Sequence, residues 1–183
     1  MKLIISALIL ILQFHSFTYS QISSKNNQSN IYKNFIPETD AFTERLISGL
    51  NAGDSLGKSV SSAGDVNGDG YGDLIVGLPG YNSGAGRAYI YFGGLVFNSA
   101  PDLTITGSAG NNLGSSVAGP GDVNGDGYDD VIIGLPGFSS GAGRVSIYFG
   151  GASMNNGSDI NFGGESAGNQ FGASVNGGGD ING

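Results

Sequence analysis

Short, mostly apolar segments alternate with glycine-rich polar segments along most of the chain. Within residues 56–112, four such segments lie around Ser59–Ser61, Leu74–Leu78, Arg87–Phe92 and Leu103–Thr106. They are bounded by turn-forming residues and are rich in Val, Ile, Tyr and Phe, as β-strands are. No window has the apolar spacing and length of an amphipathic helix. The pattern therefore predicts an all-β chain of short strands joined by tight turns.

The same pattern occurs twice in register. Residues Leu56–Gly94 align without a gap with Leu113–Gly151, and a third copy opens at Phe171, so the period is 57 and then 58 residues. A fixed period of this size indicates a repeat architecture. Four antiparallel strands per repeat predict the blade of a β-propeller. A WD-type blade fits less well, because the chain has no Trp and its one His precedes the repeats.

The period sets the expected domain boundaries. The first repeat covers residues 56–112, the second covers 113–170, and a truncated third begins at 171 and runs to 183. The segment "ERLISG" from Glu44 resembles "DLTITG" from Asp102. We therefore expect residues 44–55 to carry a copy of the fourth strand that completes the last blade of a ring. A ring needs at least four blades, so we also expect an incomplete N-terminal fragment of a longer protein.

The N-terminus has the pattern of a secretory signal peptide over residues 1–20. Lys2 precedes an apolar run, Leu3–Leu12, that is too short to span a bilayer as a helix, and small or hydroxyl residues follow it. A membrane anchor is the alternative that this length disfavours. Residues 21–43 are polar and Asn-rich, and we expect a leader or linker there. The prediction is a secreted or cell-surface protein with no membrane insertion after signal removal.

The net charge and the lack of Cys, with a single His, exclude several classes of partner and of site. The formal net charge is −8, and removal of Lys2 with the signal brings it near −9, so nucleic acid is not expected as a partner. The chain has no Cys, and its one His is His15, inside the signal segment. The mature part therefore lacks a Ser-His-Asp or Cys-His nucleophile, an imidazole or thiolate zinc site, and any disulfide. A core or bound metal must hold such a domain together.

An acidic decapeptide is the most distinctive feature of each repeat, reading "GDVNGDGYGD" from Gly64 and "GDVNGDGYDD" from Gly121. Side-chain oxygens fall at loop positions 1, 3, 5 and 9, a Gly at position 6 allows a sharp turn, and a Tyr at position 7 offers its backbone carbonyl. Such alternating oxygen ligands in one tight loop are what Ca²⁺ requires. The candidate ligands are Asp65, Asn67, Asp69, Tyr71 and Asp73 in the first loop, and Asp122, Asn124, Asp126, Tyr128 and Asp130 in the second.

A helical calcium module, a magnesium site and an ordinary turn are the alternatives for this loop. An EF-hand or dockerin-like module requires an acid near position 12 and a helix, whereas Val76 and Ile133 occupy that position inside apparent strands. Mg²⁺ prefers few protein ligands and retained water. Asp-Gly and Asn-Gly pairs also form ordinary turns. Two full copies and a partial third copy of the same acid spacing favour calcium over a simple turn.

The pattern "LGKSVSSAGDVNGDGYGDLIVGLPG", followed by "GRAYIYFGG", resembles the FG-GAP repeat of the integrin alpha-chain propeller. The resemblance covers about residues 44–183. It implies a seven-bladed extracellular β-propeller with calcium in loops on one face, often used for adhesion or ligand binding. It also extends the ligand set to Asp180 and Asn182 in the incomplete third loop. Leu56 and Leu113 replace the Phe of the opening "FG", which Phe171 retains.

Several further motifs fit both a functional role and a simpler structural one. "GDSLG" around Ser55 fits a lipase signature, but its counterpart has Asn112 and the mature chain has no His, so we expect a turn residue. The aromatic residues of "AYIYFGG" form either a sugar-stacking strip or, more commonly, part of a packed core. Arg87 and Arg144 fit a contact between blades or with a ligand. Asn27 and Asn156 begin glycosylation sequons.

These observations favour a calcium-binding adhesion or ligand-binding propeller that recognises an extracellular protein or glycan. They do not predict an enzyme within this chain. The alternatives are an accessory propeller of a secreted enzyme whose catalytic domain lies beyond residue 183, and a purely structural repeat. The ligand itself is not encoded in these repeats, because propeller specificity sits in loops that differ among blades.

Overall fold

The computed structural model describes residues 2–4, 46–49, 51, 53–96 and 99–178. The chain forms two compact units, residues 1–3 with 47–183 and residues 4–46, and the second lies almost entirely outside the described residues. Most of the predicted signal peptide and all of the predicted leader fall there, so both stay predictions. Two short strands, β1 (Lys2–Ile4) and β2 (Leu46–Ser48), form a two-stranded sheet. Strand β2 falls where the copy of the fourth strand was expected.

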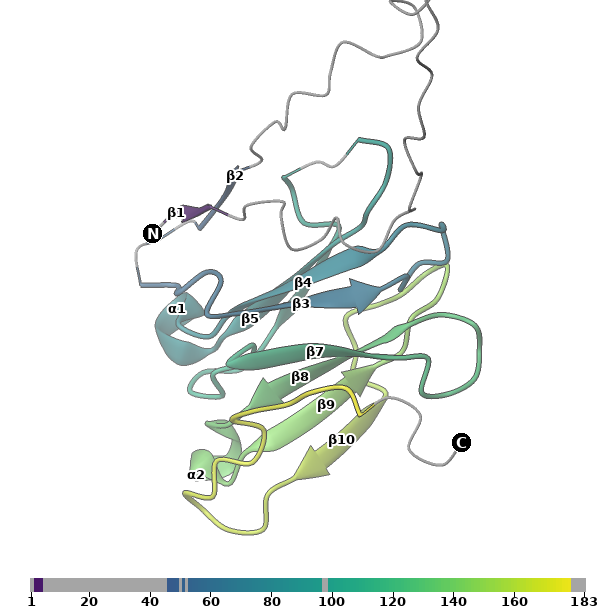
Figure 1. Ribbon diagram of the computed structural model, residues 1–183. Helices are drawn as coiled ribbons and strands as arrows, with labels where there is room; N and C mark the ends of the chain where they lie inside the picture. The colour runs from purple at the N-terminus through teal and green to yellow at the C-terminus, as the bar shows by residue number, and fades with distance from the viewer. Residues whose placement is uncertain (1, 5–45, 50, 52, 97–98, 179–183) are drawn as a thin grey trace, which may run out of the picture. The chain divides into compact units, whose positions relative to one another are not determined.

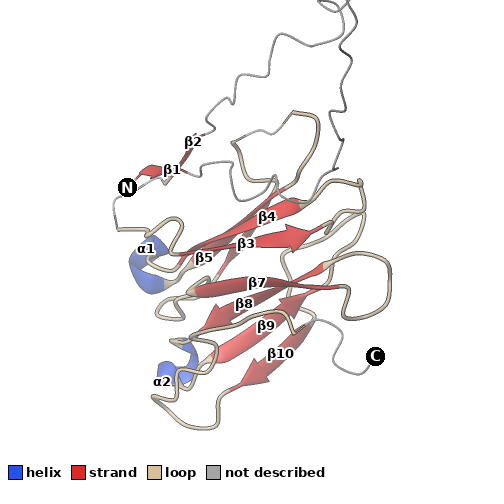
Figure 2. Ribbon diagram, viewed as in Figure 1, coloured by secondary structure: helices blue, strands red, loops and turns tan. Residues whose placement is uncertain are grey.

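Each complete repeat folds into one four-stranded antiparallel sheet, as predicted (Figure 2). The strands follow one another in chain order across each sheet, and neighbours pair antiparallel. The first sheet contains β3 (Ser59–Gly64), β4 (Asp73–Leu78), β5 (Arg87–Tyr91) and β6 (Leu103–Thr106). The second contains β7 (Ser116–Gly121), β8 (Asp130–Leu135), β9 (Arg144–Tyr148) and β10 (Ile160–Gly163). These meanders are two consecutive propeller blades, and they do not close into a ring (Figure 1).

The segments labelled α1 (Tyr81–Gly84) and α2 (Phe138–Gly141) are single turns, each joining the second and third strands of its blade. The backbone of Asn82 and Ser83 is left-handed, with φ of 46° and 57°, and Ser139 and Ser140 repeat this conformation. Left-handed pairs of residues do not build a regular helix. The prediction of an all-β chain is therefore confirmed for the described residues.

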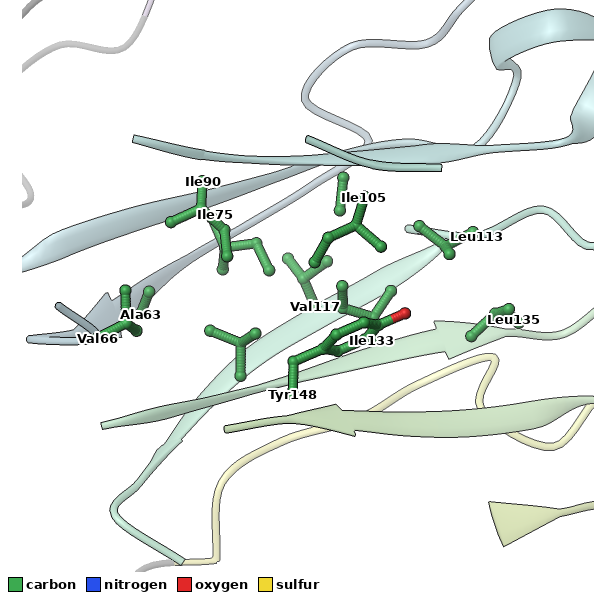
Figure 3. Close-up of a cluster of buried hydrophobic side chains, with 12 residues drawn as sticks. Ala63, Val66, Ile75, Ile90, Ile105, Leu113, Val117, Ile133, Leu135 and Tyr148 are labelled. Carbon is green, nitrogen blue, oxygen red and sulfur yellow. The ribbon is translucent and has the colours of Figure 1, made fainter. Parts of the chain in front are cut away.

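The core lies between the two sheets. Alternate residues of each strand point to one face, so each sheet presents an apolar face to the other. Figure 3 shows Ile75, Ile90 and Ile105 of the first blade facing Val117 and Ile133 of the second. Strands β3 and β7 lie side by side at the centre of this packing. Neither sheet could bury this face alone, which is why the repeats must stack.

The same sequence positions have different surroundings in the two blades. Ile75 is fully buried against the second blade, whereas its counterpart Ile132 is half-buried. Likewise Ile105 is 1% exposed, and Phe162 at the matching position is 51% exposed. The second blade therefore offers the face that in the first blade is covered by the following repeat.

Glycine allows the repeats to approach closely. A Cβ on Gly77 would lie 2.0 Å from the Gly114 carbonyl oxygen and 2.3 Å from the Ser59 hydroxyl, which itself donates a 2.8 Å hydrogen bond to that carbonyl. The second repeat has the same arrangement, with Gly134 against Gly172 and Ser116 donating to the Gly172 carbonyl at 2.7 Å. The glycines of the "GLPG" segments thus have a packing role.

The asymmetric burial generates a matched test. Ile75→Ala should lower the free energy of unfolding by about 2–4 kcal/mol, because the substitution leaves a cavity between the two sheets. Ile132→Ala should cost clearly less, because that side chain is only half-buried. Chemical denaturation of both variants measures the difference. Equal losses would contradict face-to-face packing of the two sheets.

The glycine contact generates a second test. We expect Gly77→Ala to destabilise the chain by about 1–3 kcal/mol, because the new methyl group overlaps backbone atoms of the next repeat. Gly163→Ala in β10 is the control, since a Cβ there meets nothing within 4 Å, and its effect should stay within about 0.5 kcal/mol. Thermal unfolding of the two variants compares them, and an unaffected Gly77→Ala protein would argue against the close approach.

Candidate metal centre

The two acidic loops occupy the same place in each blade. Residues 65–72 connect β3 to β4, and residues 122–129 connect β7 to β8. Each loop follows a strand irregularity, at Ser62/Gly64 in the first blade and Ala118/Gly121 in the second. Such an irregularity ends regular pairing and redirects the chain, and a glycine with positive φ closes it in both blades. The loops thus join two strands, as predicted, and are not flanked by helices.

Asp65 organises the first loop. One oxygen of its carboxylate accepts hydrogen bonds from the backbone N–H groups of Gly68 and Asp69, at 2.8 and 3.0 Å, and the other accepts from Gly70 at 2.9 Å. Gly68 and Gly70 have φ of 75° and 87°, which only glycine adopts without strain. The loop therefore wraps around the side chain of its first acidic residue.

The amide and second acid of the loop are joined to each other. The Asn67 amide nitrogen donates to one Asp69 carboxylate oxygen at 2.9 Å, and the other Asp69 oxygen accepts from the backbone of Tyr71 at 2.9 Å. The structure thus brings Asp65, Asn67 and Asp69 together in one turn. Tyr71 is 40% exposed, and the role of its carbonyl stays a prediction.

The second loop repeats this geometry. The Asp122 carboxylate accepts from the backbone of Gly125 at 2.7 Å and of Gly127 at 2.8 Å, and Asn124 donates to Asp126 at 2.8 Å. The hydrogen bond from Gly127 is the largest of the effects that lower the pKa of Asp122, because it stabilises the charged carboxylate. Two sequences separated by 57 residues therefore encode the same local structure.

The ninth-position acids, Asp73 and Asp130, are buried at the first residues of β4 and β8. One Asp73 oxygen accepts a hydrogen bond from the Val66 backbone at 2.9 Å and the other from the Gly93 backbone at 2.7 Å. This carboxylate therefore links the loop to the segment that follows β5. Asp130 makes the same two contacts in its own blade. The sequence predicted Asp73 and Asp130 as ligands but did not predict their hydrogen bonds with the Gly93 and Gly150 backbones.

Burial makes the charge on these acids unfavourable. The pKa of Asp73 is raised to about 6, mainly because burial removes solvation from the charged carboxylate. Its two backbone hydrogen bonds oppose the rise, and the nearby charges of Asp69 and Asp65 add a smaller contribution to it. The pKa of Asp130 is raised for the same reasons. Burial therefore disfavours the charged form of the ninth-position acid in each loop.

The donor set fits a hard divalent cation. Each loop offers three carboxylates and one amide oxygen, which suit Ca²⁺, together with uncompensated charge. Among the described residues, however, no three acidic or His side chains converge on one point as a metal cluster would, and the carboxylates accept backbone hydrogen bonds instead. Asp180 and Asn182 lie outside the described residues.

The remaining motifs have structural roles. Matching positions of the three repeats have the same left-handed backbone, with φ of 58° at Ser55, 52° at Asn112 and 53° at Gln170. This conformation agrees with the turn role expected for Ser55. The Arg87 guanidinium stacks on the Tyr81 ring at 3.6 Å, and Arg144 stacks on Phe138 at 3.5 Å. Each arginine thus packs against a turn of its own blade, a contact that the sequence did not predict.

Of the aromatic residues in "AYIYFGG", Tyr91 is 1% and Tyr89 is 9% exposed, so both belong to the packed interior.

One structural residue was not predicted from the sequence. Asp129, at loop position 8, accepts a hydrogen bond from the backbone of Asp65 in the first loop at 2.7 Å. The available signal was the single difference between the two decapeptides, since Gly72 holds this position in the first.

Comparison with known proteins agrees with this architecture. The sequence model of the FG-GAP repeat matches residues 57–91 and 113–148, inside the two predicted repeats. Similar proteins include mouse integrin alpha-3, with 33% identity over 60% of this chain and 11% of the relative, and Xenopus laevis integrin alpha-5, with 34% identity over 68% and 12%. Mouse integrin alpha-7 is 40% identical over 63% of this chain and 9% of the relative.

This chain thus spans about a tenth of the length of these relatives. In this chain, the matched residues cover the first three strands of each blade, β3 to β5 and β7 to β9, and both acidic loops. The chain therefore carries two consecutive FG-GAP repeats and is similar to integrin alpha chains across them.

Proposed function

We propose that this chain is part of an extracellular, calcium-stabilised β-propeller that binds a protein or glycan ligand in adhesion. The observation that carries the proposal is the duplicated acidic loop, folded in the same way at the same place in two FG-GAP blades. Similarity to integrin alpha chains supports the adhesion or ligand-binding role. The signal-like residues 1–20 support secretion.

Calcium would be held in each loop by the residues at positions 1, 3, 5, 7 and 9. In the first loop these are Asp65, Asn67, Asp69, the Tyr71 carbonyl and Asp73, and the second and third loops would use their counterparts. A divalent cation would favour the ionised form of buried Asp73, whose pKa is raised without it. It would thereby offset the mutual repulsion of the loop acids and stabilise the fold.

The blades themselves fit a binding scaffold better than a catalyst. No described helix has the length and apolar character to cross a membrane. The repeats contain neither His nor Cys, so they lack an imidazole base and a thiol nucleophile for covalent catalysis. Rigid sheets that present loops at both ends provide positions for ligand contacts without chemistry.

Calorimetric titration tests the metal sites. We expect two saturable calcium sites in the described repeats. Asp69→Asn should weaken calcium binding at the first site by at least about tenfold, and Asp126→Asn should do the same at the second. Both substitutions keep an oxygen that can accept the local backbone hydrogen bond, so they change mainly charge. Glu165→Gln, an exposed acid outside the loops, is the control and should bind as the unchanged chain does. Calcium binding that survives both loop substitutions would contradict the assignment.

Ligand binding has a separate test. The full chain, immobilised with calcium, should retain a member of a panel of extracellular-matrix proteins and glycans, and a chelator should release it, because calcium holds the blades in place. Surface plasmon resonance measures the retention. If the calcium-loaded, folded protein retains no member of the panel, the adhesion role is contradicted while the calcium sites can stand.

A further inference from the structure

The first acidic loop is held by residues of the second repeat. A carboxylate oxygen of Asp129 accepts the backbone N–H of Asp65 at 2.7 Å, and the backbone N–H of Asp129 donates to the Asp65 carbonyl at 3.1 Å. Both backbone groups of the residue that begins the first loop are thus fixed by one residue of the next blade.

Further contacts extend this docking. The backbone N–H of Gly151 donates to the Val66 carbonyl at 2.7 Å. The Tyr128 ring lies against Gly68, where an added Cβ would be 2.5 Å from Cε1. A Cβ on Gly64 would lie 2.1 Å from an Asp129 carboxylate oxygen, so glycine leaves room for that carboxylate. Residues of the second repeat therefore contact the first half of the loop, from Gly64 to Gly68.

The second loop shows what the same sequence looks like without such a neighbour among the described residues. Val66 is fully buried, whereas Val123 at the matching position is 48% exposed. Asp65 is half-buried, and Asp122 is exposed. The two loops share their internal hydrogen bonds, so the difference comes from the following repeat.

The fixed residue is the one around which the loop wraps. The Asp65 side chain accepts three backbone hydrogen bonds within its loop, so the position of its backbone sets the position of the other loop groups. A site that is already ordered loses less conformational entropy when a ligand binds. Docking of the second repeat therefore preorganises the first loop.

We propose that Asp129 is a positioning residue for the first calcium loop, so that the affinity of this loop depends on docking of the following repeat. This inference rests on the proposed calcium function. Linkage makes the effect reciprocal: calcium in the first loop strengthens the contact between the blades by the same factor. The contact needs an acidic side chain at loop position 8, which Asp129 supplies. The first repeat has Gly72 at this position, and glycine has no side chain to make such a contact.

The test measures the affinity of each loop separately in the full chain. Asp126→Asn silences the second loop so that calorimetry reports the first, and Asp69→Asn does the reverse. Into each background we introduce Asp129→Gly, which copies the residue of the first repeat, and Asp129→Asn, which keeps an acceptor oxygen but removes the charge. Circular dichroism and thermal unfolding establish that each variant is folded.

We expect Asp129→Gly to weaken calcium binding at the first loop about tenfold, as loss of one charge-assisted hydrogen bond does, and at the second loop by no more than about twofold. Asp129→Asn should weaken the first loop less, since its amide oxygen can accept the Asp65 N–H. In the metal-free protein, hydrogen exchange of the Asp65 amide should accelerate in Asp129→Gly.

The outcomes distinguish failure of the proposed calcium function from failure of the positioning role of Asp129. No saturable calcium binding at either loop, with a folded protein, overturns the proposed metal function and this inference with it. Calcium binding at the first loop that is unchanged by Asp129→Gly overturns the inference alone, as does an equal loss at both loops. If Asp129→Gly does not fold, the ratio of the two loop affinities in Asp129→Asn decides the question in the same way.

Discussion

Face-to-face packing of consecutive sheets is the constraint on which the rest of this structure depends. Each blade has an apolar face that it cannot bury by itself, and Ile75 and Ile90 of the first blade are buried only because the second blade covers them. The repeated glycines follow from the same constraint, since Gly77 and Gly134 lie where the backbone of the next repeat approaches. Packing of the blades therefore accounts for the glycines at these two positions.

The acidic loops depend on this packing as well. Their internal geometry is local, built from short-range hydrogen bonds onto Asp65 or Asp122. Their surroundings are not local, because Asp129 and Gly151 reach the first loop from the neighbouring blade. A charged loop that would otherwise resist folding is thus attached to the interface that stabilises the fold. The first of the two proposed calcium loops therefore lies at the interface between the blades.

The sequence predicted the local features well. The four strands of each repeat, their order and the loop between the first two follow from short apolar segments, turn residues and the 57-residue period. The predicted first strand ended at Ser61, whereas β3 continues to Gly64 through an irregularity that only its pairing with β4 reveals. Individual side-chain contacts were not predictable, because no sequence pattern indicates that Arg87 stacks on Tyr81 or that Asp73 accepts a hydrogen bond from the Gly93 backbone.

The central proposal is that each of the two loops is a cation site within stacked blades. Anomalous diffraction from crystals of the full chain grown with calcium tests it most directly. The account predicts one peak in each loop, bounded by Asp65, Asn67 and Asp69 in the first repeat and by Asp122, Asn124 and Asp126 in the second. Ordered loops without a peak, in crystals whose blades stack as described, would contradict it.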